Sequence, residues 1–329
     1  MMFSIPAPHG ERIEIPTIPS DETIIYPTMA DPGAVRDYYD REGYVVVRGL
    51  VDRRACDEMR AVFDGEVKPF EGYIYRQASA NPERHVRTQF GYMLNSILNI
   101  HAVDPRFFPT FRRHGADLIT SAPLQSAVRA ILGEAGKIVQ SMYFEGNPAT
   151  WAHQDTYYLD SEKLGMMAGV WIALEDIAPG SGRFFIYPRS HLVDLALNRG
   201  SMSIASNHAG YKKQVIDIIR QNGLECRAPA LRKGDVLFWS SKTIHGSMET
   251  TQPERSRSSV TAHYIPVSTR FLQYQTRIKP LSLSTINGMQ VHTPKDLASP
   301  IHRLVMGLET RFPRAFTSVK NAAVRVVTR

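Results

Sequence analysis

The feature that most restricts the fold is a series of short strand signals in the second half of the chain. They are rich in β-branched and aromatic residues, and turn residues such as Pro179–Gly182 separate them. The signals lie at 138–144, 168–174, 183–187, 235–239 and 260–266. Many short strands with frequent turns build a β-sandwich or a barrel, and a jelly roll is one such arrangement. We therefore predict a β core at about 137–266.

Helix signals flank this core. Asp31 followed by Pro32, with Gly43 after the last turn, predicts a short helix, and a β-branched strand follows at 44–48. Further helices are predicted at 52–64, within 105–132, within a polar insert at 192–222, and at 300–329. The first 30 residues hold five prolines and predict an extended N-terminal arm. The expected fold class is mainly β with flanking helices (α+β), with one domain at 31–299 and a C-terminal helical extension at 300–329.

Composition limits the class of protein. With 329 residues, of which 43% are hydrophobic and 22% charged, the chain can bury one large core. It has no run of about 18 apolar residues and no signal-peptide pattern at its start, so we expect a cytoplasmic protein. Cys56 and Cys226 are too few for a disulfide framework and lack zinc-site spacing. We expect two free thiols, in a reducing compartment.

The net charge of +7 favours an anionic partner. The basic residues are scattered and form no nucleic-acid recognition motif, so nucleic acid is not expected, and no segment suits a membrane. A soluble, anionic small molecule fits better, although the charge is equally compatible with a solvated surface. The sequence does not indicate an oligomeric state.

A candidate metal site follows the first strand of the core. His153 and Asp155 are two residues apart, so an extended backbone places both side chains on one face. An imidazole and a carboxylate are two parts of the 2-His-1-carboxylate triad that holds Fe(II) with open positions. The third ligand must come from elsewhere, and His245 is the best candidate. A His-x-Asp tripeptide alone is weak evidence in a chain with 11 histidines.

A long irregular stretch at 70–101 is a second candidate feature. It contains Tyr73, Tyr75, Arg76, Arg84 and Arg87 without clear periodicity. Such stretches are commonly functional loops, so this one is expected either to line a pocket or to be a basic surface loop. Because a guanidinium suits carboxylate or phosphate recognition, we hypothesise that one of these arginines contacts an anionic substrate.

Four pieces of the sequence, in matching order, resemble the phytanoyl-CoA dioxygenase (PhyH-like) family of Fe(II)- and 2-oxoglutarate-dependent oxygenases. They are Glu42–Leu50, Trp151–Tyr158, Val170–Ile177 with Gly182–His191, and Leu231–Trp239 through His245–Ser247 to Arg257 and His263–Tyr264. Two departures are visible: Pro188-Arg-Ser-His replaces the usual Pro-Gly-Ser-His, and the loop after His245 is one residue longer. The resemblance spans roughly 35–266, and neither departure touches a candidate ligand.

The resemblance implies a double-stranded β-helix, a cupin-like jelly roll whose mouth holds Fe(II) through His153, Asp155 and His245. It implies 2-oxoglutarate as co-substrate and O2 as oxidant, with release of succinate and CO2. The expected outcome is hydroxylation of an unactivated C–H bond in a small-molecule or carrier-linked substrate. Desaturation, epoxidation or cyclisation in natural-product biosynthesis is an alternative, as is a non-catalytic cupin-like binding protein. A halogenase is disfavoured because Asp155 fills the position that a halide would need.

The co-substrate residues follow from strand parity and from the resemblance. Arg257 begins the polar face of the 260–266 strand, whereas Arg255 lies where the chain is still turning, so Arg257 is expected to pair with the far carboxylate of 2-oxoglutarate. The resemblance also implies that Gln140, Thr156 and Ser247 hydrogen-bond 2-oxoglutarate, although each could instead satisfy local backbone. Trp171 is expected to wall the cavity or to be a core residue. His191 is expected to be structural rather than a ligand.

Overall fold

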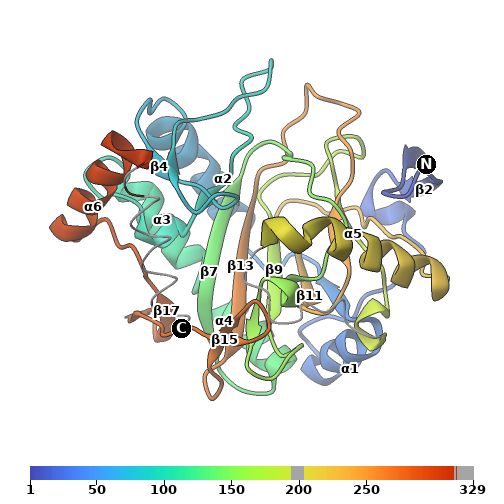
Figure 1. Ribbon diagram of the computed structural model, residues 1–329. Coiled ribbons are helices and arrows are strands. Elements are labelled where there is room, and N and C mark those ends of the chain that lie inside the picture. The colour runs from blue at the N-terminus through green and yellow to red at the C-terminus, as the bar shows by residue number, and fades with distance from the viewer. Residues whose placement is uncertain (194–203, 315, 317–329) are drawn as a thin grey trace.

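The computed structural model describes residues 1–193, 204–314 and 316, and a large mixed sheet forms its centre (Figure 1). The strands of this sheet are β3 (Tyr44–Val47), β6 (Ile97–Leu98), β7 (Gly136–Phe144), β9 (Ala168–Ala173), β11 (Val236–Ser240), β13 (Ser259–Pro266), β16 (Leu283–Ile286) and β17 (Met289–His292). Their order is β16-β17-β7-β13-β9-β11-β3, with β6 paired to β7. Each of the five strand signals expected from the sequence corresponds to a strand of the structure.

Smaller sheets complete the β structure. They are the pair β10 (Phe184–Ile186) and β12 (His245–Ser247), the trio β8 (Leu159–Ser161), β14 (Phe271–Gln273) and β15 (Arg277–Ile278), and the hairpins β1 (Met2–Pro6) with β2 (Arg12–Pro16) and β4 (Ile74–Tyr75) with β5 (Pro82–Glu83). The β10–β12 pair faces the inner side of the large sheet, where the Phe184 ring centroid lies 4.9 Å from that of Trp239. In the described residues these sheets do not close into a barrel.

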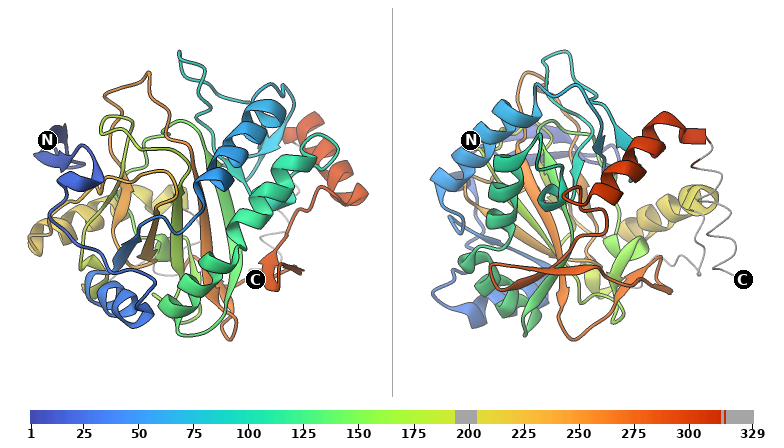
Figure 2. Two further views of the ribbon diagram at one scale, coloured as in Figure 1. Left: turned by 180° about the vertical axis from the view of Figure 1, so that it is seen from behind. Right: turned by 90° about the vertical axis from the view of Figure 1, so that its left-hand side faces the viewer.

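Helices cover the outer face of the large sheet. The α-helices are α1 (Pro32–Glu42), α2 (Arg53–Val62), α3 (Pro109–Ile119), α4 (Ala122–Leu132), α5 (Ile204–Gln221) and α6 (Pro300–Arg311). Figure 2, seen from behind, shows α2, α3 and α4 lying across this face. Along β13, Val260, Ala262 and Tyr264 join the core beneath these helices, because alternate residues of a strand face the same way. Their neighbours Thr261 and His263 therefore face inward.

Local sequence explains where α1 begins and ends. The Asp31 side chain accepts a hydrogen bond from the backbone N–H of Ala34 at 3.0 Å. Gly43 ends the helix with a φ of 78°, which favours glycine, and a Cβ there would lie 2.3 Å from the His191 ring. The predicted helix at 31–43 is confirmed.

The N-terminal arm packs against the body of the protein. Its β1–β2 hairpin buries Ile5 and Ile15 in a second core cluster with Phe185 and Tyr187. The buried guanidinium of Arg183 donates hydrogen bonds to backbone carbonyls at the end of β2. The arm is therefore tied to the β10 edge of the core.

The remaining expectations concern the helical segments and the thiols. The signal within 105–132 corresponds to two helices, and α5 lies within the polar insert, of which residues 194–203 fall outside the described part. The C-terminal signal corresponds to α6, and 315 and 317–329 are likewise not described. Cys56 and Cys226 are free thiols, as expected.

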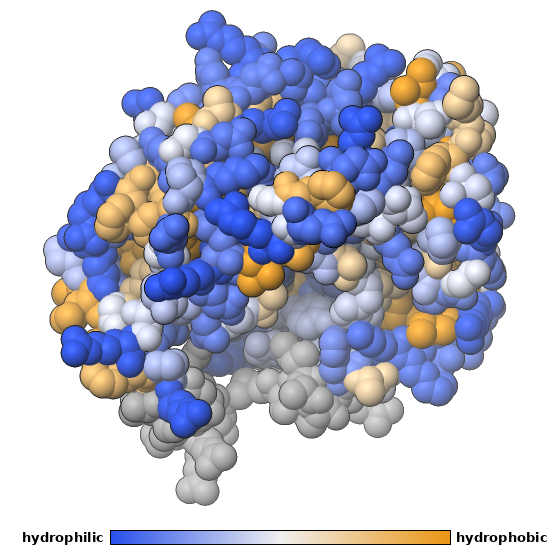
Figure 3. Space-filling view, turned by 90° about the horizontal axis from the view of Figure 1, so that it is seen from above, coloured by the Kyte–Doolittle hydropathy of each residue, from blue (hydrophilic) through white to orange (hydrophobic). Residues whose placement is uncertain are grey.

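Two findings concern the surface. Among the described residues, every helix is too short or too polar to cross a lipid bilayer. Figure 3 shows that the face seen from above is largely hydrophilic, with hydrophobic residues scattered in small patches. Most large apolar side chains are instead buried in the core clusters.

Candidate metal centre and co-substrate pocket

The two histidines of the predicted triad are joined by an antiparallel bridge. The backbone N–H of His153 donates to the carbonyl of His245 at 3.0 Å, and that of His245 donates to the carbonyl of His153 at 2.9 Å. Their ring centroids are 4.4 Å apart. Because His245 begins β12, this bridge brings together two residues that are 92 positions apart in sequence.

Asp155 completes the cluster. Gln154 has an extended backbone (φ −110°, ψ 131°), so the side chains of His153 and Asp155 lie on the same side of the chain, as predicted. Oδ1 of Asp155 lies 3.5 Å from Nε2 of His153 and 3.6 Å from Nε2 of His245. In the part of the chain that the structure describes, these three residues are the one His/Cys/Asp/Glu group whose ligand atoms gather as a metal site requires.

The protonation of both imidazoles suits metal binding. Nδ1 of His153 donates to the Trp151 carbonyl at 2.8 Å, and Nδ1 of His245 donates to the Thr243 carbonyl at 2.9 Å. In the neutral form of each ring these bonds place the proton on Nδ1, which leaves Nε2, the nitrogen nearer Asp155, as the atom that could bind a metal. Burial lowers the pKa of His245 to about 4, even though Asp155 acts to raise it, so this imidazole is neutral at pH 7. Two neutral nitrogens and one carboxylate oxygen are a donor set that fits Fe(II) with open coordination positions.

Two further side chains hold Asp155. The indole N–H of Trp239 donates to Oδ2 at 2.8 Å, and Nε2 of His263 lies 3.3 Å from the same oxygen. Burial acts to raise the pKa of Asp155, but His245, His263 and His153 outweigh it and hold the pKa well below its usual range. Neither Trp239 nor His263 was predicted from the sequence to have a role in the site. The alternation of side chains along β13 indicated that His263 faces inward.

Arg257 is buried without an acidic partner among the described residues. Its side chain is 3% exposed, and its one hydrogen bond goes from Nη1 to the carbonyl of Gly182 at 3.1 Å. The guanidinium carbon lies 5.6 Å from the ring of Phe144 and 5.9 Å from that of Trp171. Burial lowers the pKa of Arg257 to about 10, so it remains charged at pH 7. A buried, unpaired cation of this kind fits the carboxylate of 2-oxoglutarate.

The other predicted co-substrate residues lie in different surroundings. Trp171 packs beside Arg257, whereas Ser247 accepts a hydrogen bond at Oγ from the backbone N–H of Thr150 at 2.7 Å. Thr156 is fully buried beside Asp160. Gln140 faces inward from β7, opposite His263, and lines a large cavity. Thus Trp171 is adjacent to Arg257, Ser247 satisfies local backbone, and Gln140 lies on the far side of His263.

The arginines of the 70–101 stretch do not line this cavity. Arg76 is fully buried and donates to the carbonyls of Glu83 and Asn95, and Arg87 donates to those of Gly91 and Lys68. The tyrosines of the same stretch, Tyr73 and Tyr75, do line the cavity. The hypothesis that these arginines bind an anionic substrate is therefore not supported by their contacts.

His191 and Arg255 lie apart from the triad. Nε2 of His191 donates to the carbonyl of Asp40 at 2.9 Å, which fixes the turn after α1, so this histidine is structural as expected. Arg255 is exposed in the loop between β12 and β13.

Comparison with known proteins agrees with this arrangement. The family model described as phytanoyl-CoA dioxygenase (PhyH) matches residues 39–258. A phytanoyl-CoA dioxygenase domain-containing protein 1 from Bos taurus is 30% identical over 263 residues, which cover 68% of this chain and 87% of the relative. A homologue of it from Caenorhabditis elegans is 20% identical over 265 residues, covering 70% and 89% of the two chains.

Solved structures with a similar fold include enzymes of several activities. The epimerase SnoN, in complex with Fe3+, alpha ketoglutarate and nogalamycin RO, matches with a TM-score of 0.54 at 18% identity, covering 80% of this chain and 98% of its own. EctD from S. alaskensis with bound Fe matches with a TM-score of 0.51 at 19% identity, covering 85% and 89%. The carbocyclase SnoK matches with a TM-score of 0.52 at 17% identity, covering 71% and 84%. At these identities the likeness concerns the fold, whereas the family model matches most of the sequence, and the chain belongs to the phytanoyl-CoA dioxygenase family.

Proposed function

We propose that this protein is an Fe(II)- and 2-oxoglutarate-dependent dioxygenase that hydroxylates an unactivated C–H bond of a small molecule. His153, Asp155 and His245 hold the metal, and Arg257 holds the far carboxylate of 2-oxoglutarate. Iron held by these residues would, with 2-oxoglutarate and O2, supply oxidative decarboxylation to succinate and CO2, with one oxygen atom passing to the substrate. Family membership and the His-Asp-His cluster support the proposal.

The observation that carries it is the buried, uncompensated charge of Arg257. Leaving a cation in an apolar interior is costly, so such a group is expected to meet an anion in the working protein. The aromatic rings of Phe144 and Trp171 exclude water around it. Arg257 lies two residues before β13, whose inward face carries Thr261 and then His263 beside Asp155, and we infer that 2-oxoglutarate lies between the guanidinium and the metal.

The other side chains have supporting roles. Trp171 walls the co-substrate cavity, while Trp239 and His263 keep Asp155 ionised and oriented. Ser247, at the end of β12, accepts from the Thr150 N–H at Oγ, and the Thr156 N–H donates to the Ser241 carbonyl, so both residues shape the same region. Gln140 closes the cavity on the substrate side of the metal, where its amide can hydrogen-bond 2-oxoglutarate or the substrate.

The test is to replace Arg257 and Arg255 separately with glutamine. Arg257→Gln should raise KM for 2-oxoglutarate at least a hundredfold, because an unpaired carboxylate would be left in a buried site at a cost of about 3–5 kcal/mol. Arg257→Lys should recover only part of this, since lysine has no planar fork for two oxygens. Arg255→Gln is the matched control and should behave as wild type. A large effect of Arg255→Gln with a normal Arg257→Gln variant would refute the assignment.

Two measurements separate this function from its alternatives. Succinate release that requires iron and 2-oxoglutarate distinguishes an oxygenase from a non-catalytic cupin-like protein. Mass analysis of the product then distinguishes hydroxylation from desaturation, epoxidation or cyclisation. The second measurement is needed because structures of similar fold include a carbocyclase and an epimerase.

A further inference from the structure

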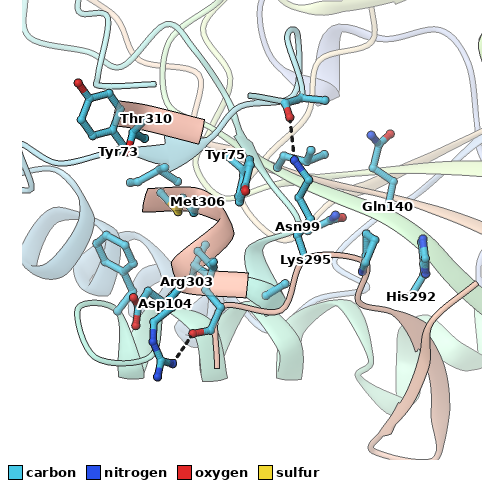
Figure 4. A pocket seen from close by; sticks show the side chains of 18 of the residues that line it. Tyr73, Tyr75, Asn99, Asp104, Gln140, His292, Lys295, Arg303, Met306 and Thr310 are labelled. Carbon is cyan, nitrogen blue, oxygen red and sulfur yellow. Dashed lines mark hydrogen bonds between the residues drawn. The ribbon is translucent and has the colours of Figure 1, made fainter. Parts of the chain in front are cut away.

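The helix α5 supplies no candidate metal ligand and no wall to the cavity beside β7. That cavity measures about 400 Å³ and lies between β7 and α6, and its lining contains no described residue of α5 (Figure 4). Instead, α5 packs into the second core cluster through three buried side chains, Tyr211, Val215 and Ile219. The same cluster contains Ala152 and Tyr157, which flank His153 and Asp155 in sequence. The buried face of α5 therefore meets the segment that carries two of the three candidate ligands.

The hydroxyl of Tyr211 makes two hydrogen bonds to Gln154, the residue between those two ligands. It accepts from the backbone N–H of Gln154 at 2.8 Å and donates to the carbonyl of Gln154 at 3.0 Å. A backbone N–H can only donate, so the hydroxyl proton is the one that reaches the carbonyl. Both residues are fully buried.

These two bonds fix both peptide units between the ligands. The N–H of Gln154 belongs to the peptide that follows His153, and its carbonyl belongs to the peptide that precedes Asp155. Gln154 is extended, with φ −110° and ψ 131°, and an extended residue between them is what lets His153 and Asp155 face the same way. One hydroxyl therefore holds the backbone geometry on which the ligand pair depends.

The packing of its ring holds the Tyr211 hydroxyl in place. The ring stacks on that of Tyr157, with centroids 3.6 Å apart and planes 17° apart. Burial raises the pKa of Tyr211 well above its ordinary value, so the hydroxyl keeps the proton that it donates. The donor and the acceptor are thus both present at the position that Gln154 requires.

Two neighbours of Tyr211 on α5 contact the same segment. The His208 ring meets the Trp151 ring edge-on at 4.9 Å, and Nε2 of His208 lies 3.4 Å from the Tyr158 hydroxyl. Nζ of Lys212 lies 4.8 Å from the centroid of the Trp151 ring. Side chains three and four positions apart share one face of a helix, so these contacts come from the same face as Tyr211. That face of α5 lies along the whole segment from 151 to 158.

We propose that Tyr211 is a positioning residue of the metal centre, whose hydroxyl sets the relative orientation of His153 and Asp155 by holding the two peptide units between them. The inference rests on the proposed function in taking these residues to hold Fe(II). It acts through the backbone, whereas the Trp239 indole bonds to the Asp155 carboxylate itself. An insert between the strands thereby becomes part of what holds the metal centre.

The first experiment measures Fe(II) affinity by anaerobic calorimetry on the full chain. Tyr211→Phe keeps the stacked ring and removes only the hydroxyl, so it should lower Fe(II) affinity about tenfold. Tyr187→Phe is the matched control, because that buried tyrosine lies in the same core cluster and its hydroxyl bonds to the Cys226 thiol instead. Both variants lose a buried hydrogen bond, but only Tyr211→Phe should bind iron more weakly. Wild-type affinity in Tyr211→Phe, or an equal loss in both variants, would overturn the inference.

The second experiment reports ligand geometry rather than affinity. Co(II) serves as the probe, because its visible absorption depends on the arrangement of the ligands around it. At saturating Co(II), the spectrum of Tyr211→Phe should differ from that of the wild type, and the spectrum of Tyr187→Phe should not. Identical spectra for Tyr211→Phe and the wild type would reduce Tyr211 to a packing residue.

A third variant restores the lost group. Tyr211→4-aminophenylalanine places an N–H donor with a lone pair where the hydroxyl stood, so it should recover most of the Fe(II) affinity and the wild-type Co(II) spectrum. Absence of any recovery in this variant, with its fold confirmed by circular dichroism, would count against the proposed contact with Gln154.

Affinity for 2-oxoglutarate separates this inference from the proposed function. A wild-type protein that binds Fe(II) but has no affinity for 2-oxoglutarate would refute the proposed function and leave the role of Tyr211 standing. A wild-type protein that binds both, with unchanged Fe(II) affinity in Tyr211→Phe, would refute this inference alone.

Discussion

At the scale of single residues, the metal cluster depends on how Asp155 is held. One oxygen faces the two imidazoles, and the other accepts the indole N–H of Trp239. A carboxylate with one oxygen fixed in this way cannot rotate away from the metal position. Removing a group that hydrogen-bonds to a metal ligand commonly lowers metal affinity by 10- to 100-fold.

We predict that Trp239→Phe lowers Fe(II) affinity about 10- to 100-fold while the protein stays folded, because phenylalanine keeps much of the ring packing but lacks the donor. Anaerobic calorimetry with Fe(II) measures this, and circular dichroism checks the fold. Trp151→Phe is the control, since that indole also lies near a ligand, with its ring centroid 5.8 Å from that of His153, but donates no hydrogen bond to the cluster. Unchanged iron affinity in Trp239→Phe would show that the indole does not orient Asp155.

At the scale of elements, the register between β9 and β11 makes room for that indole. Gly169 stands directly opposite Trp239, and a Cβ at this glycine would lie 2.1 Å from the indole ring. The ring therefore lies over the backbone of the neighbouring strand. A glycine is needed here for close approach rather than for an unusual φ.

Gly169→Ala should displace the indole, lower the free energy of unfolding by about 1–3 kcal/mol and weaken iron binding as Trp239→Phe does. Urea unfolding and calorimetry provide the two measurements. Gly65→Ala is the matched substitution, because a Cβ there would meet nothing within 4 Å. Normal iron affinity in Gly169→Ala would mean that the indole tolerates the added methyl group.

A second contact between elements joins the segment after β6 to β7 and to β17. His101 is buried after β6, and it contacts Ser141 of β7 at 3.0 Å and the carbonyl of His292 in β17 at 2.9 Å. Burial, aided by the charge of Arg112, lowers the pKa of His101 to about 4 from an ordinary 6.5. The folded protein therefore keeps this ring neutral where the unfolded chain would bind a proton.

The direction of the resulting pH dependence of stability follows from the number of protons that the folded and unfolded states bind at His101. Below about pH 6.5 the unfolded chain binds more protons at this position, so the stability contributed by neutral His101 falls as the pH drops from 6.5 toward 4. Between about pH 7.5 and about pH 5 the loss is about 2 kcal/mol. In His101→Gln, which keeps a donor for His292 but does not titrate, the difference between the two pH values should shrink by that amount. Urea titrations at both values check this, and an unaltered pH dependence would contradict it.

At the scale of the whole molecule, Arg183 joins the N-terminal hairpin to the core. It is 1% exposed and donates to the carbonyls of Pro16, Thr17 and Ile177. We predict that Arg183→Met lowers the free energy of unfolding by about 2–3 kcal/mol, because buried carbonyls lose their donors. Hydrogen exchange should show the hairpin losing protection. Arg12→Gln, within the exposed part of the hairpin, is the control. Unchanged protection of the hairpin in Arg183→Met would show that Arg183 does not anchor it to the core.

Much of the architecture followed from local sequence. Alternating and β-branched runs predicted β7, β9, β11 and β13, and the capped ends of α1 followed from Asp31, Pro32 and Gly43. The closeness of His153 and Asp155 also followed, because an extended Gln154 between them fixes their relation by backbone geometry alone. Parity also predicted that Arg257 points inward; in the structure this residue precedes β13 rather than beginning it, and its side chain is buried. These features depend on residues a few positions apart.

The tertiary structure decided what distant segments do together. Only the bridge between His153 and His245 completes the metal cluster, and only the β9–β11 register brings Trp239 to Asp155. The cavity beside β7 is closed by α6 and the strand before it, from a part of the sequence with no motif. Periodicity reports which way a side chain faces within one element, whereas pairing between elements depends on the packing of the whole chain. That physical difference is why the sequence identified the candidate ligands, while their supporting residues and the cavity beside β7 emerged from the folded structure.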